Sequence, residues 1–449
     1  MNTNKNLTIT NAWICQISGQ KIIPEFGDIL ISEGSISDIR KKDFKDFLSK
    51  PLQNSDESIN ACGRVITVPM INFHDHFYSR LAKGLSIKGS MENFKLILQN
   101  LWWKLDLSLD AEIIQASSQM AALESIRNGV TYIFDHHSSP NSATGSLEII
   151  ANVLSEFGLR GVLCFETTDR NGKLLAENGI SENINYFRNS TDNNLKAMLG
   201  LHASFTLKDD TLRKASELIK ELGLGIHIHL CEDKVDRKDS FTKYKKYPVN
   251  RLKQFDLLNE KSILAHGIHL TNEDYSVIAR GGSAIVYNLD SNFNNAAGLP
   301  ELSQAPSNIL ILTGTDGMNS NPARTFKQLF LIARHQGMVF EQAFDWIKKV
   351  FFDQLNFVQK YFSDFPSLNI KDRADLIIWD YVPPTPFMEE NFWGHFIYGI
   401  LDRPIHSVIQ NGNVLMSNFK ISFDDFEYQK NIVEQGNRLY NKMLEINSD

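Results

Sequence analysis

Eight short apolar runs recur through the middle of the chain, separated by polar stretches with helical spacing. They occupy residues 65–76, 130–137, 160–166, 195–204, 225–232, 262–270, 283–289 and 309–317. Short apolar runs are typical of buried strands, and their alternation with helices indicates a parallel sheet. The pattern therefore predicts an α/β fold with a (β/α)8 TIM-like barrel over residues 67–369. Residues 111–128 fill one gap as a predicted helix, with Asp110 able to cap its start and Gly129 to close its end.

The two ends of the chain differ from the middle, because both are rich in alternating, strand-like segments. Residues 7–14 and 28–39 contain such segments with a turn at Glu33-Gly34, and residues 374–417 contain another pair around Asn411-Gly412. Asn-Gly between alternating runs is a strong hairpin signal. Neither end has enough strands for a sheet of its own, so we expect residues 1–66 and 370–449 to form one small β-sandwich. Residues 426–446 have helical periodicity and are expected to dock on the outside.

Composition and charge narrow the classes of partner. The chain has 449 residues, of which 42% are hydrophobic and 22% charged, with a formal net charge of -7. This balance disfavours nucleic acid and anionic membranes as partners. No apolar run reaches the roughly 18 residues of a membrane span. Four scattered cysteines, Cys15, Cys62, Cys164 and Cys231, suggest reduced thiols and a cytoplasmic protein.

Ionisable residues gather where the predicted strands end. His74, Asp75 and His76 end the first strand, and Asp135, His136 and His137 end the second. Other strands end near His202, His229, Glu232, His266 and Asp316. Active sites of such barrels lie at the C-terminal ends of the strands. Core histidines would be scattered instead, so this clustering favours a functional site.

Strand geometry indicates which of these side chains could bind the same metal ion. Side chains alternate faces along a strand, so His74 and His76 point to the same side and Asp75 to the other. His229 lies near the rim on the fifth strand, whereas His227 lies one layer lower. Three imidazoles with the Asp316 carboxylate and a water molecule suit Zn²⁺ well and Fe²⁺ acceptably. By itself, the His-x-His pair remains a weak signal.

The residues quoted next resemble a known family. The segments "NFHDHFYSRLAKGL", "GLHASFT", "HLCED", "LAHGIHL" and "GTDG" occur in the order typical of the amidohydrolase superfamily, in its aminohydrolase/chlorohydrolase branch. "NLWWKLDLSLD", "FDHHSSPNSATGSL" and "LCFETTDRNG" are similar to the SsnA-like aminohydrolases, and the likeness covers nearly the whole chain. Two departures are the absence of a proline before Ser291-Asn292 and the presence of Asp75 where threonine is common. The first affects the wall of the expected pocket, and neither departure removes a ligand.

The resemblance implies specific roles. It makes His74, His76, His229 and Asp316 the ligands of one divalent metal, Zn²⁺ or alternatively Fe²⁺. Glu232 would be the proton shuttle, His266 would polarise the water or the substrate, and Asp316 would also take part in catalysis. His202 and Asn292, the latter in its usual place after strand seven, would touch the substrate. The implied reaction is hydrolytic deamination of a nitrogen heterocycle by a metal-activated water, with release of ammonia.

The expected metal count is one. Relatives with two metals bridge them with a carboxylated lysine or a glutamate at the end of strand four. Here the lysine of that strand, Lys196, lies at the opposite end, and Glu166 ends strand three instead. A mononuclear site favours deamination over the opening of a ring amide.

Several further features have two interpretations. Trp102 and Trp103 either wall a pocket for a flat ring or pack in the core. Asp135, His136 and His137 either contact substrate, as we predict for His137, or support the ligands. Lysines 234, 238, 243, 245 and 246 either attract an acidic substrate or form a solvated surface, which is the commoner case.

Alternative functions are hydrolysis of a C–Cl bond or a cyclic amide by the same site, and a catalytically silent binding protein. Silent homologues usually lose a ligand or the shuttle, and this chain keeps all of them. The expected partner is a small heterocyclic substrate. Relatives are often dimers, so a homodimer is a further expectation.

Overall fold

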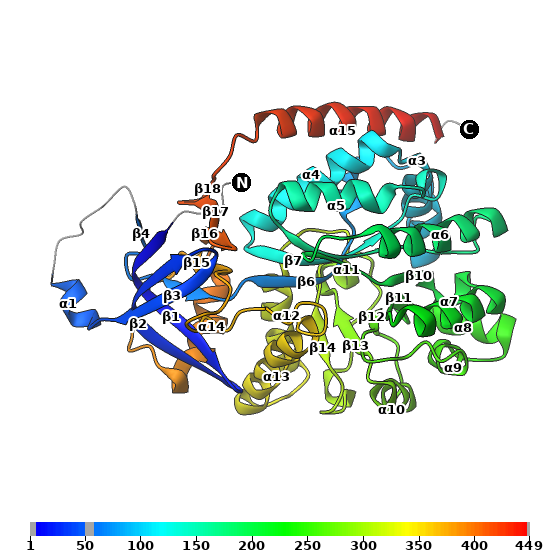
Figure 1. Ribbon diagram of the computed structural model, residues 1–449. Helices are drawn as coiled ribbons and strands as arrows, with labels where there is room; N and C mark the ends of the chain where they lie inside the picture. Colours follow the sequence, from blue (N-terminus) through cyan, green and yellow to red (C-terminus); the bar gives the residue numbers. More distant parts are fainter. Residues whose placement is uncertain (1–5, 50–57, 447–449) are drawn as a thin grey trace.

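The computed structural model describes residues 6–49 and 58–446; the outermost residues of the expected terminal unit, 1–5 and 447–449, and its segment 50–57 lie outside the described part. Figure 1 shows a sheet-rich unit beside a larger unit in which helices surround central strands. No helix in the described part of the chain combines the length and apolar character that a membrane span requires.

The larger unit is built on parallel strands. One sheet has the order β6-β7-β8-β9 and the other β10-β11-β12-β13-β14. Bridges between Asp75 and Asp316 and between Thr167 and Leu201 join the two sheets at both edges. Only Met198 separates β9 from β10, so they form one interrupted strand and the ring has eight strand positions. The strands are β6 (Met70–Asp75), β7 (Val130–His137), β8 (Arg160–Phe165), β9 (Leu195–Ala197), β10 (Leu199–Ala203), β11 (Ile226–Leu230), β12 (Ile263–His266), β13 (Ala284–Tyr287) and β14 (Ile311–Thr313).

The predicted (β/α)8 barrel is therefore confirmed, with a strand in each of the eight predicted runs. The outer helices are α4 (Ala111–Arg127), α5 (Ser146–Glu156), α6 (Lys173–Asn189), α7 (Asp209–Leu222), α8 (Lys234–Tyr244), α9 (Pro248–Gln254), α10 (Asn272–Gly281), α11 (Leu289–Asn294), α12 (Pro322–His335) and α13 (Phe340–Val358). Helix α4 begins as predicted, with the Asp110 carboxylate accepting a hydrogen bond from the Ile113 amide at 3.2 Å. Gly129 follows it with a left-handed φ of 69°.

The first predicted run is divided between the two units. Its start is β5 (Val65–Thr67), which belongs to the terminal sheet, and its end is β6 of the barrel. Pro69 lies between them, and proline has no backbone N–H to donate to a sheet. The chain therefore leaves one sheet and enters the other at this point.

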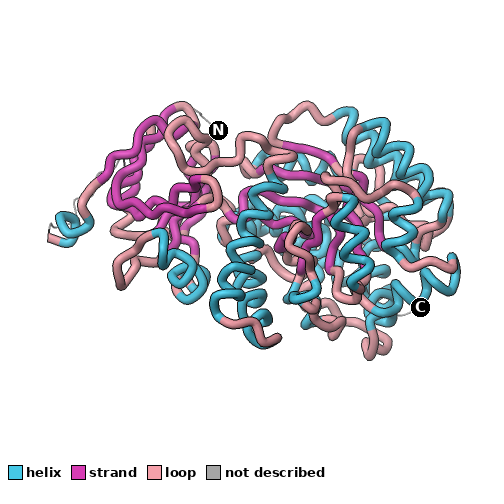
Figure 2. Tube along the Cα trace, turned by 90° about the horizontal axis from the view of Figure 1, so that it is seen from below, coloured by secondary structure: helices cyan, strands magenta, loops and turns pink. Residues whose placement is uncertain are grey.

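Both ends of the chain contribute to a single nine-stranded sheet. Its order is β18-β17-β16-β15-β5-β1-β2-β3, and β4 also pairs with β1. The N-terminal part supplies β1 (Leu7–Ser18), β2 (Lys21–Ser32), β3 (Ser35–Lys41), β4 (Ser58–Asn60) and β5. The C-terminal part supplies β15 (Leu376–Trp379), β16 (Ile405–Gln410), β17 (Asn413–Ser417) and β18 (Lys420–Ile421). The two parts meet where β5 and β15 pair antiparallel, with Ile66 opposite Ile378. Figure 2 shows these strands bent around rather than flat.

The two predicted hairpin turns are present and touch each other. Glu33 and Gly34 have φ values of 52° and 77°, and Asn411 and Gly412 have 51° and 74°. Left-handed conformation at both central residues is what a tight two-residue hairpin needs. A Cβ on Gly34 would lie 2.5 Å from the Asn411 side-chain oxygen, so this close approach requires glycine.

Helix α15 (Phe426–Ile446) follows the sheet in sequence but lies along the barrel helices, as Figure 1 shows. The Arg438 and Lys442 side chains pair with Asp110, the residue that caps α4. The expectation that this helix docks on the outside is thus met, on the barrel rather than on its neighbouring sheet. Short helices α1 (Phe44–Leu48), α2 (Phe94–Ile97), α3 (Trp103–Ser108) and α14 (Phe392–Tyr398) complete the fold, with a π-helical turn over Leu98–Trp102.

Candidate metal centre and active site

Four side chains from three strands converge at the C-terminal end of the barrel. His74 lies on β6 and His76 directly follows it, His229 lies on β11, and Asp316 follows β14. One potential ligand atom from each of them lies within 4.8 Å of all the others. Distant parts of the sequence therefore meet as the strand pattern predicts.

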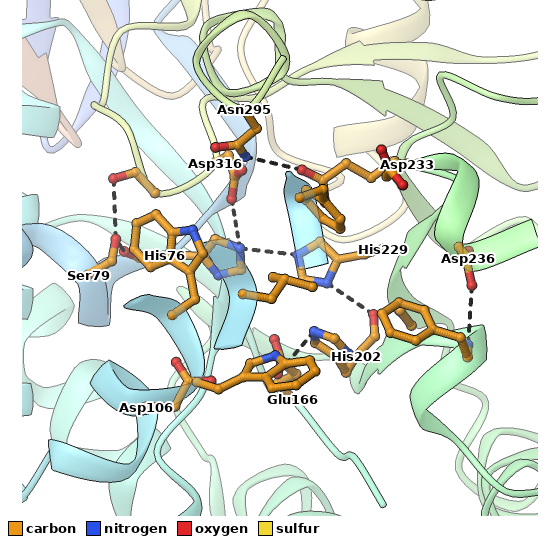
Figure 3. A pocket seen from close by; sticks show the side chains of 18 of the residues that line it. His76, Ser79, Asp106, Glu166, His202, His229, Asp233, Asp236, Asn295 and Asp316 are labelled. Atoms are coloured by element: carbon orange, nitrogen blue, oxygen red, sulfur yellow. Dashed lines mark hydrogen bonds and ion pairs between the residues drawn. The ribbon is translucent and has the colours of Figure 1, made fainter. Parts of the chain in front are cut away.

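The ligand atoms themselves face one another. His76 Nε2 lies 2.8 Å from Asp316 Oδ1 and 3.2 Å from His229 Nε2. His74 Nε2 lies 3.7 Å from Asp316 Oδ1, too far for a hydrogen bond, and this buried nitrogen has no partner. Figure 3 shows His76, His229 and Asp316 directed toward one another.

The outer ring nitrogens decide which form these imidazoles take. His76 Nδ1 lies 2.5 Å from the carbonyl oxygen of His136, and His229 Nδ1 lies 3.0 Å from that of His202. A carbonyl oxygen only accepts hydrogen bonds, so each Nδ1 carries the proton and donates it. In neutral rings both Nε2 atoms would present lone pairs to each other across 3.2 Å. Burial disfavours a charge on His76, but the Asp316 carboxylate raises the pKa of His76 to about 9, so without a metal His76 Nε2 carries a proton directed at Asp316 Oδ1. A metal ion bound there would replace this proton, and such outer contacts are usual for metal-binding histidines.

These residues fit a divalent metal ion. Three imidazole nitrogens and one carboxylate oxygen are a common donor set for such ions. The orphaned His74 Nε2 supplies the structural test, because a buried nitrogen without a partner is costly unless a ligand satisfies it. The four side chains therefore have the chemistry and the spacing to hold a divalent cation.

The Asp316 carboxylate is held in place by its backbone and by Ser291. Asp316 has a left-handed φ of 56°, and its amide donates to the carbonyl oxygen of His74 at 2.9 Å. The Ser291 hydroxyl donates to Asp316 Oδ2, which leaves Oδ1 facing the histidines. Burial alone would raise the pKa of this carboxyl, but the His76 and His74 imidazoles hold it well below its usual value. Asp316 is therefore ionised, with Oδ1 directed at the histidines.

Glu232 and His266 lie beside the four ligands. His266 Nε2 lies 3.6 Å from Glu232 Oε2, and both residues have potential ligand atoms within 4.8 Å of Asp316. Burial raises the pKa of Glu232 to about 7. A carboxyl with this pKa both accepts and releases a proton near neutral pH. The His266 Nδ1 atom hydrogen-bonds Asn292 Oδ1 at 3.0 Å, which orients the ring.

A cavity opens above this cluster (Figure 3). Phe94, Leu98, Trp102 and Trp103 from the segment after β6 line it together with Phe205 after β10. Among the residues predicted to bind substrate, His202 and Trp103 line the cavity. Trp102 also lines the cavity, so both tryptophans of the pair form part of the cavity wall.

The other two predicted substrate residues do not reach the cavity. His137 is fully buried, its Nε2 lies 2.8 Å from the Ser139 hydroxyl, and its ring packs between Tyr78 and Phe165. Asn292 is also fully buried and lies behind His266. Alternation along a strand indicates a face but not the depth at which a side chain lies, and this explains the difference.

Histidines that the strand pattern left ambiguous now have defined contacts. His227 Nε2 lies 2.8 Å from His74 Nδ1, one layer below the metal ligands as predicted. His136 Nε2 lies 3.1 Å from the carbonyl oxygens of Leu201 and His227. Both rings are fully buried and hold the ligand-bearing strands together. None of the lysines at 234, 238, 243, 245 and 246 lines the cavity, which favours the surface interpretation.

Sequence reasoning missed a buried ionic cluster at the cavity wall. Arg170 donates to Glu166 Oε1 at 2.9 Å and to Asp106 Oδ2, and all three side chains are less than 8% exposed. Asp106 lies on α3, within the largely apolar stretch "LWWKLDLSL", whose other polar residues are Lys104 and Ser108. A lone carboxylate among leucines and tryptophans was the available signal, since such a position is buried only if it has a partner.

The contacts of Glu166 in this cluster also affect whether a second metal ion could bind nearby. Glu166, His136 and His229 bring ligand atoms within 4.8 Å of one another. However, Glu166 is already bonded to Arg170, whose positive charge opposes a second cation, and the His136 Nε2 faces two carbonyl oxygens. His229 is shared with the first site.

Comparison with known proteins extends this picture. The model of the amidohydrolase family matches residues 65–415. The chain is 25% identical to the 5-methylthioadenosine/S-adenosylhomocysteine deaminase of Desulforudis audaxviator (strain MP104C), over 98% of this chain and 99% of that protein. It is 26% identical to the 5'-deoxyadenosine deaminase of Methanococcus aeolicus, over 94% of this chain and 96% of that protein.

The fold has a close counterpart among solved structures. A zinc-bound adenosine deaminase from Xanthomonas campestris superimposes with a TM-score of 0.77, at 17% identity, over 97% of this chain and 99% of that one. The family match spans the barrel and, in the terminal sheet, β5, β15, β16 and the first residues of β17, and it includes His74, His76, His229 and Asp316. This chain belongs to the amidohydrolase family.

Proposed function

We propose that the protein is a metal-dependent aminohydrolase that replaces an amino group on a nitrogen heterocycle with water and releases ammonia. The observation that carries this proposal is the convergence of His74, His76, His229 and Asp316 beside the Glu232–His266 pair. A cation held there supplies the acidity that makes a water molecule a nucleophile near neutral pH. Zn²⁺ is the proposed ion because three nitrogens and one oxygen suit it, and Fe²⁺ is the alternative.

Glu232 moves the proton in this proposal. Its carboxylate takes a proton from the attacking water and returns it to the ring or to the departing amino nitrogen. The pKa of about 7, raised by burial, suits both directions of transfer. Asn295 donates to Glu232 Oε1 at 3.4 Å, which restrains one oxygen and leaves Oε2 toward His266.

His266 and Asp316 complete the proposed machinery. His266 Nε2 is buried without a hydrogen-bond partner, so in its protonated form it can donate to negative charge that develops on the substrate. Asp316 serves as a ligand and as a proton acceptor while the amino group leaves. The proposal requires a single cation, in line with the occupied contacts of Glu166 and His136.

The proposed substrate class is an amino-substituted purine or a related nucleoside. The named relatives act on 5-methylthioadenosine, S-adenosylhomocysteine and 5'-deoxyadenosine, which share an aminopurine. The flat faces of Trp102 and Trp103 in the cavity wall suit an aromatic ring. We further propose a cytoplasmic location, which the four unpaired cysteines support, while a homodimer stays a prediction.

The test is ammonia release by protein loaded with Zn²⁺ or Fe²⁺, assayed on aminopurines, aminopyrimidines, pterins and aminotriazines. Activity that depends on metal and on Glu232 would support the proposal. Release of chloride from a chlorotriazine, or opening of a cyclic amide, without ammonia from any amine would favour the alternative hydrolase. Metal-loaded protein that is inert in all three assays would indicate the silent binding protein instead.

A further inference from the structure

The cavity above the metal centre is strongly acidic. Its wall contains six carboxylates, and none of the described residues that line it is a lysine or an arginine. The six are Asp106, Glu166, Glu232, Asp233, Asp236 and Asp316. Away from the metal, the net charge of the cavity therefore depends on whether each carboxylate is paired with a cation.

Four of these groups already have a role. Asp316 and Glu232 belong to the reaction centre described above. Asp233 caps α8 by accepting from the Val235 amide at 2.8 Å. Asp236 accepts from the amides of Cys231 and Phe205 at 2.9 and 3.2 Å. The remaining pair, Asp106 and Glu166, lies on the opposite wall, as Figure 3 shows.

Arg170 is the cation nearest to this pair, and both carboxylates bind it. Its two terminal nitrogens donate to Glu166 Oε1 and Asp106 Oδ2, and its guanidinium lies 5.3 Å from the centre of the Trp103 ring. Arg170 itself does not line the cavity, because the carboxylates lie between it and the opening. With at least one carboxyl ionised, the cluster has a net charge of zero or less.

One oxygen of this cluster, Asp106 Oδ1, is buried and has no hydrogen-bond partner at normal distance, and Asp106 is only 2% exposed. The Ser138 hydroxyl, which lies beside the pair, donates to Glu166 Oε1 at 3.4 Å. A buried carboxylate oxygen is stabilised by an N–H or O–H donor and destabilised by another anion. The described lining also contains no lysine or arginine that could form an ion pair with a carboxylate or phosphate on a ligand.

We propose that this site accepts uncharged or cationic aminopurine compounds with a free O–H or N–H group, and excludes those that carry a carboxylate or phosphate. The determinant of this charge preference is that Asp106 and Glu166 already bind Arg170, so its positive charge is not free to pair with an anionic ligand. This inference rests on the proposed function and names the charge class of its substrate. Asp106 Oδ1 receives the donor group of the substrate, while the amino-bearing ring faces Glu232.

The experiment compares three compounds that differ at one position, adenosine, 5'-amino-5'-deoxyadenosine and adenosine 5'-monophosphate. Binding to the zinc-loaded Glu232→Gln variant is followed by quenching of Trp102 and Trp103 fluorescence, so that turnover is not needed. We expect the neutral and cationic compounds to bind at least roughly tenfold more tightly than the phosphate. Equal or tighter binding of the phosphate overturns the proposal, and so does binding by none of the three.

Substitution of the masking groups gives the second arm. Asp106→Asn frees one side of Arg170, and the ratio of phosphate to adenosine affinity should rise roughly tenfold. Asp364→Asn is the matched control, because it removes a carboxylate from Arg160, 2.8 Å away at the start of β8 and the opposite end of the barrel. An unchanged ratio in Asp106→Asn overturns the proposal. Binding in the expected order without any ammonia release by wild type would contradict the proposed deamination alone.

Discussion

The Nε2 atoms of His76 and His229 lie 3.2 Å apart while the Nδ1 atoms of both rings donate to backbone carbonyl oxygens. The backbone therefore fixes a proton on the outer nitrogen of each ring and directs both inner nitrogens at one point. Burial disfavours a charge on His76, but the Asp316 carboxylate raises the pKa of His76 to about 9, so without a metal a proton occupies this point. A bound cation would replace that proton, and the main chain thus helps to place the nitrogens that we propose as its ligands.

Removal of the metal should lower the thermal stability of the protein. A ligand that binds only the folded state at about 1,000 times its Kd contributes about 4 kcal/mol. We expect dialysis against a chelator to lower the Tm and one equivalent of Zn²⁺ to restore it. Differential scanning calorimetry with metal analysis measures both, and Asp316→Asn is expected to lose the zinc-dependent shift. A Tm that does not change when the chelator removes the metal would contradict stabilisation by a metal at this site.

Replacement of Glu232 by glutamine should abolish proton transfer while the ligands stay in place. General acid–base groups contribute about 10²–10⁴-fold to rate, so kcat should fall by that factor. Steady-state ammonia release and metal content are measured together. Glu217→Gln, on the exposed face of α7, removes the same charge and should leave kcat unchanged. Full activity in Glu232→Gln would exclude the proposed shuttle.

The same substitution should change how the stability of metal-free protein depends on pH. Burial raises the pKa of Glu232 to about 7, so the folded state binds its proton more tightly than the unfolded state. Ionisation of Glu232 therefore costs stability as pH rises from about 4.5 to about 7, up to about 3 kcal/mol at 1.4 kcal/mol per pKa unit. Urea unfolding should show that Glu232→Gln gains stability relative to wild type at pH 8 but not at pH 4. An equal difference at both pH values would contradict the raised pKa.

Gly314→Ala should disturb the contact between β14 and β6. A Cβ there would lie 2.9 Å from the His74 Cβ and amide nitrogen and 2.4 Å from Asn288 Oδ1. Overpacking of this kind typically costs about 1–3 kcal/mol, and here it displaces a metal ligand. Zinc affinity and unfolding free energy should both fall. Gly394→Ala meets no atom within 4 Å and is expected to be near neutral; an effect of Gly314→Ala no larger than this control would show that β14 tolerates a side chain.

Local patterns determined much of this protein. Eight apolar runs predicted the barrel strands, and the two-residue alternation along β6 placed His74 and His76 on one face. The Asn411-Gly412 and Glu33-Gly34 turns were predictable because a hairpin of this length needs left-handed backbone, which these residues accept. Such features depend on neighbours in the chain, so the sequence by itself contains them.

Only the tertiary structure decided which distant groups meet and which side chains reach the cavity. Asp106 on α3 and the pair Glu166 and Arg170 after β8 come from two distant segments and form one cluster. His137 ends β7 and Asn292 lies on α11 after β13, yet both pack away from the cavity. Helix α15 follows the terminal sheet in sequence but is paired through Arg438 and Lys442 with Asp110 of the barrel. Periodicity indicates the face of an element, whereas depth, partner and charge balance depend on contacts between elements far apart in the sequence.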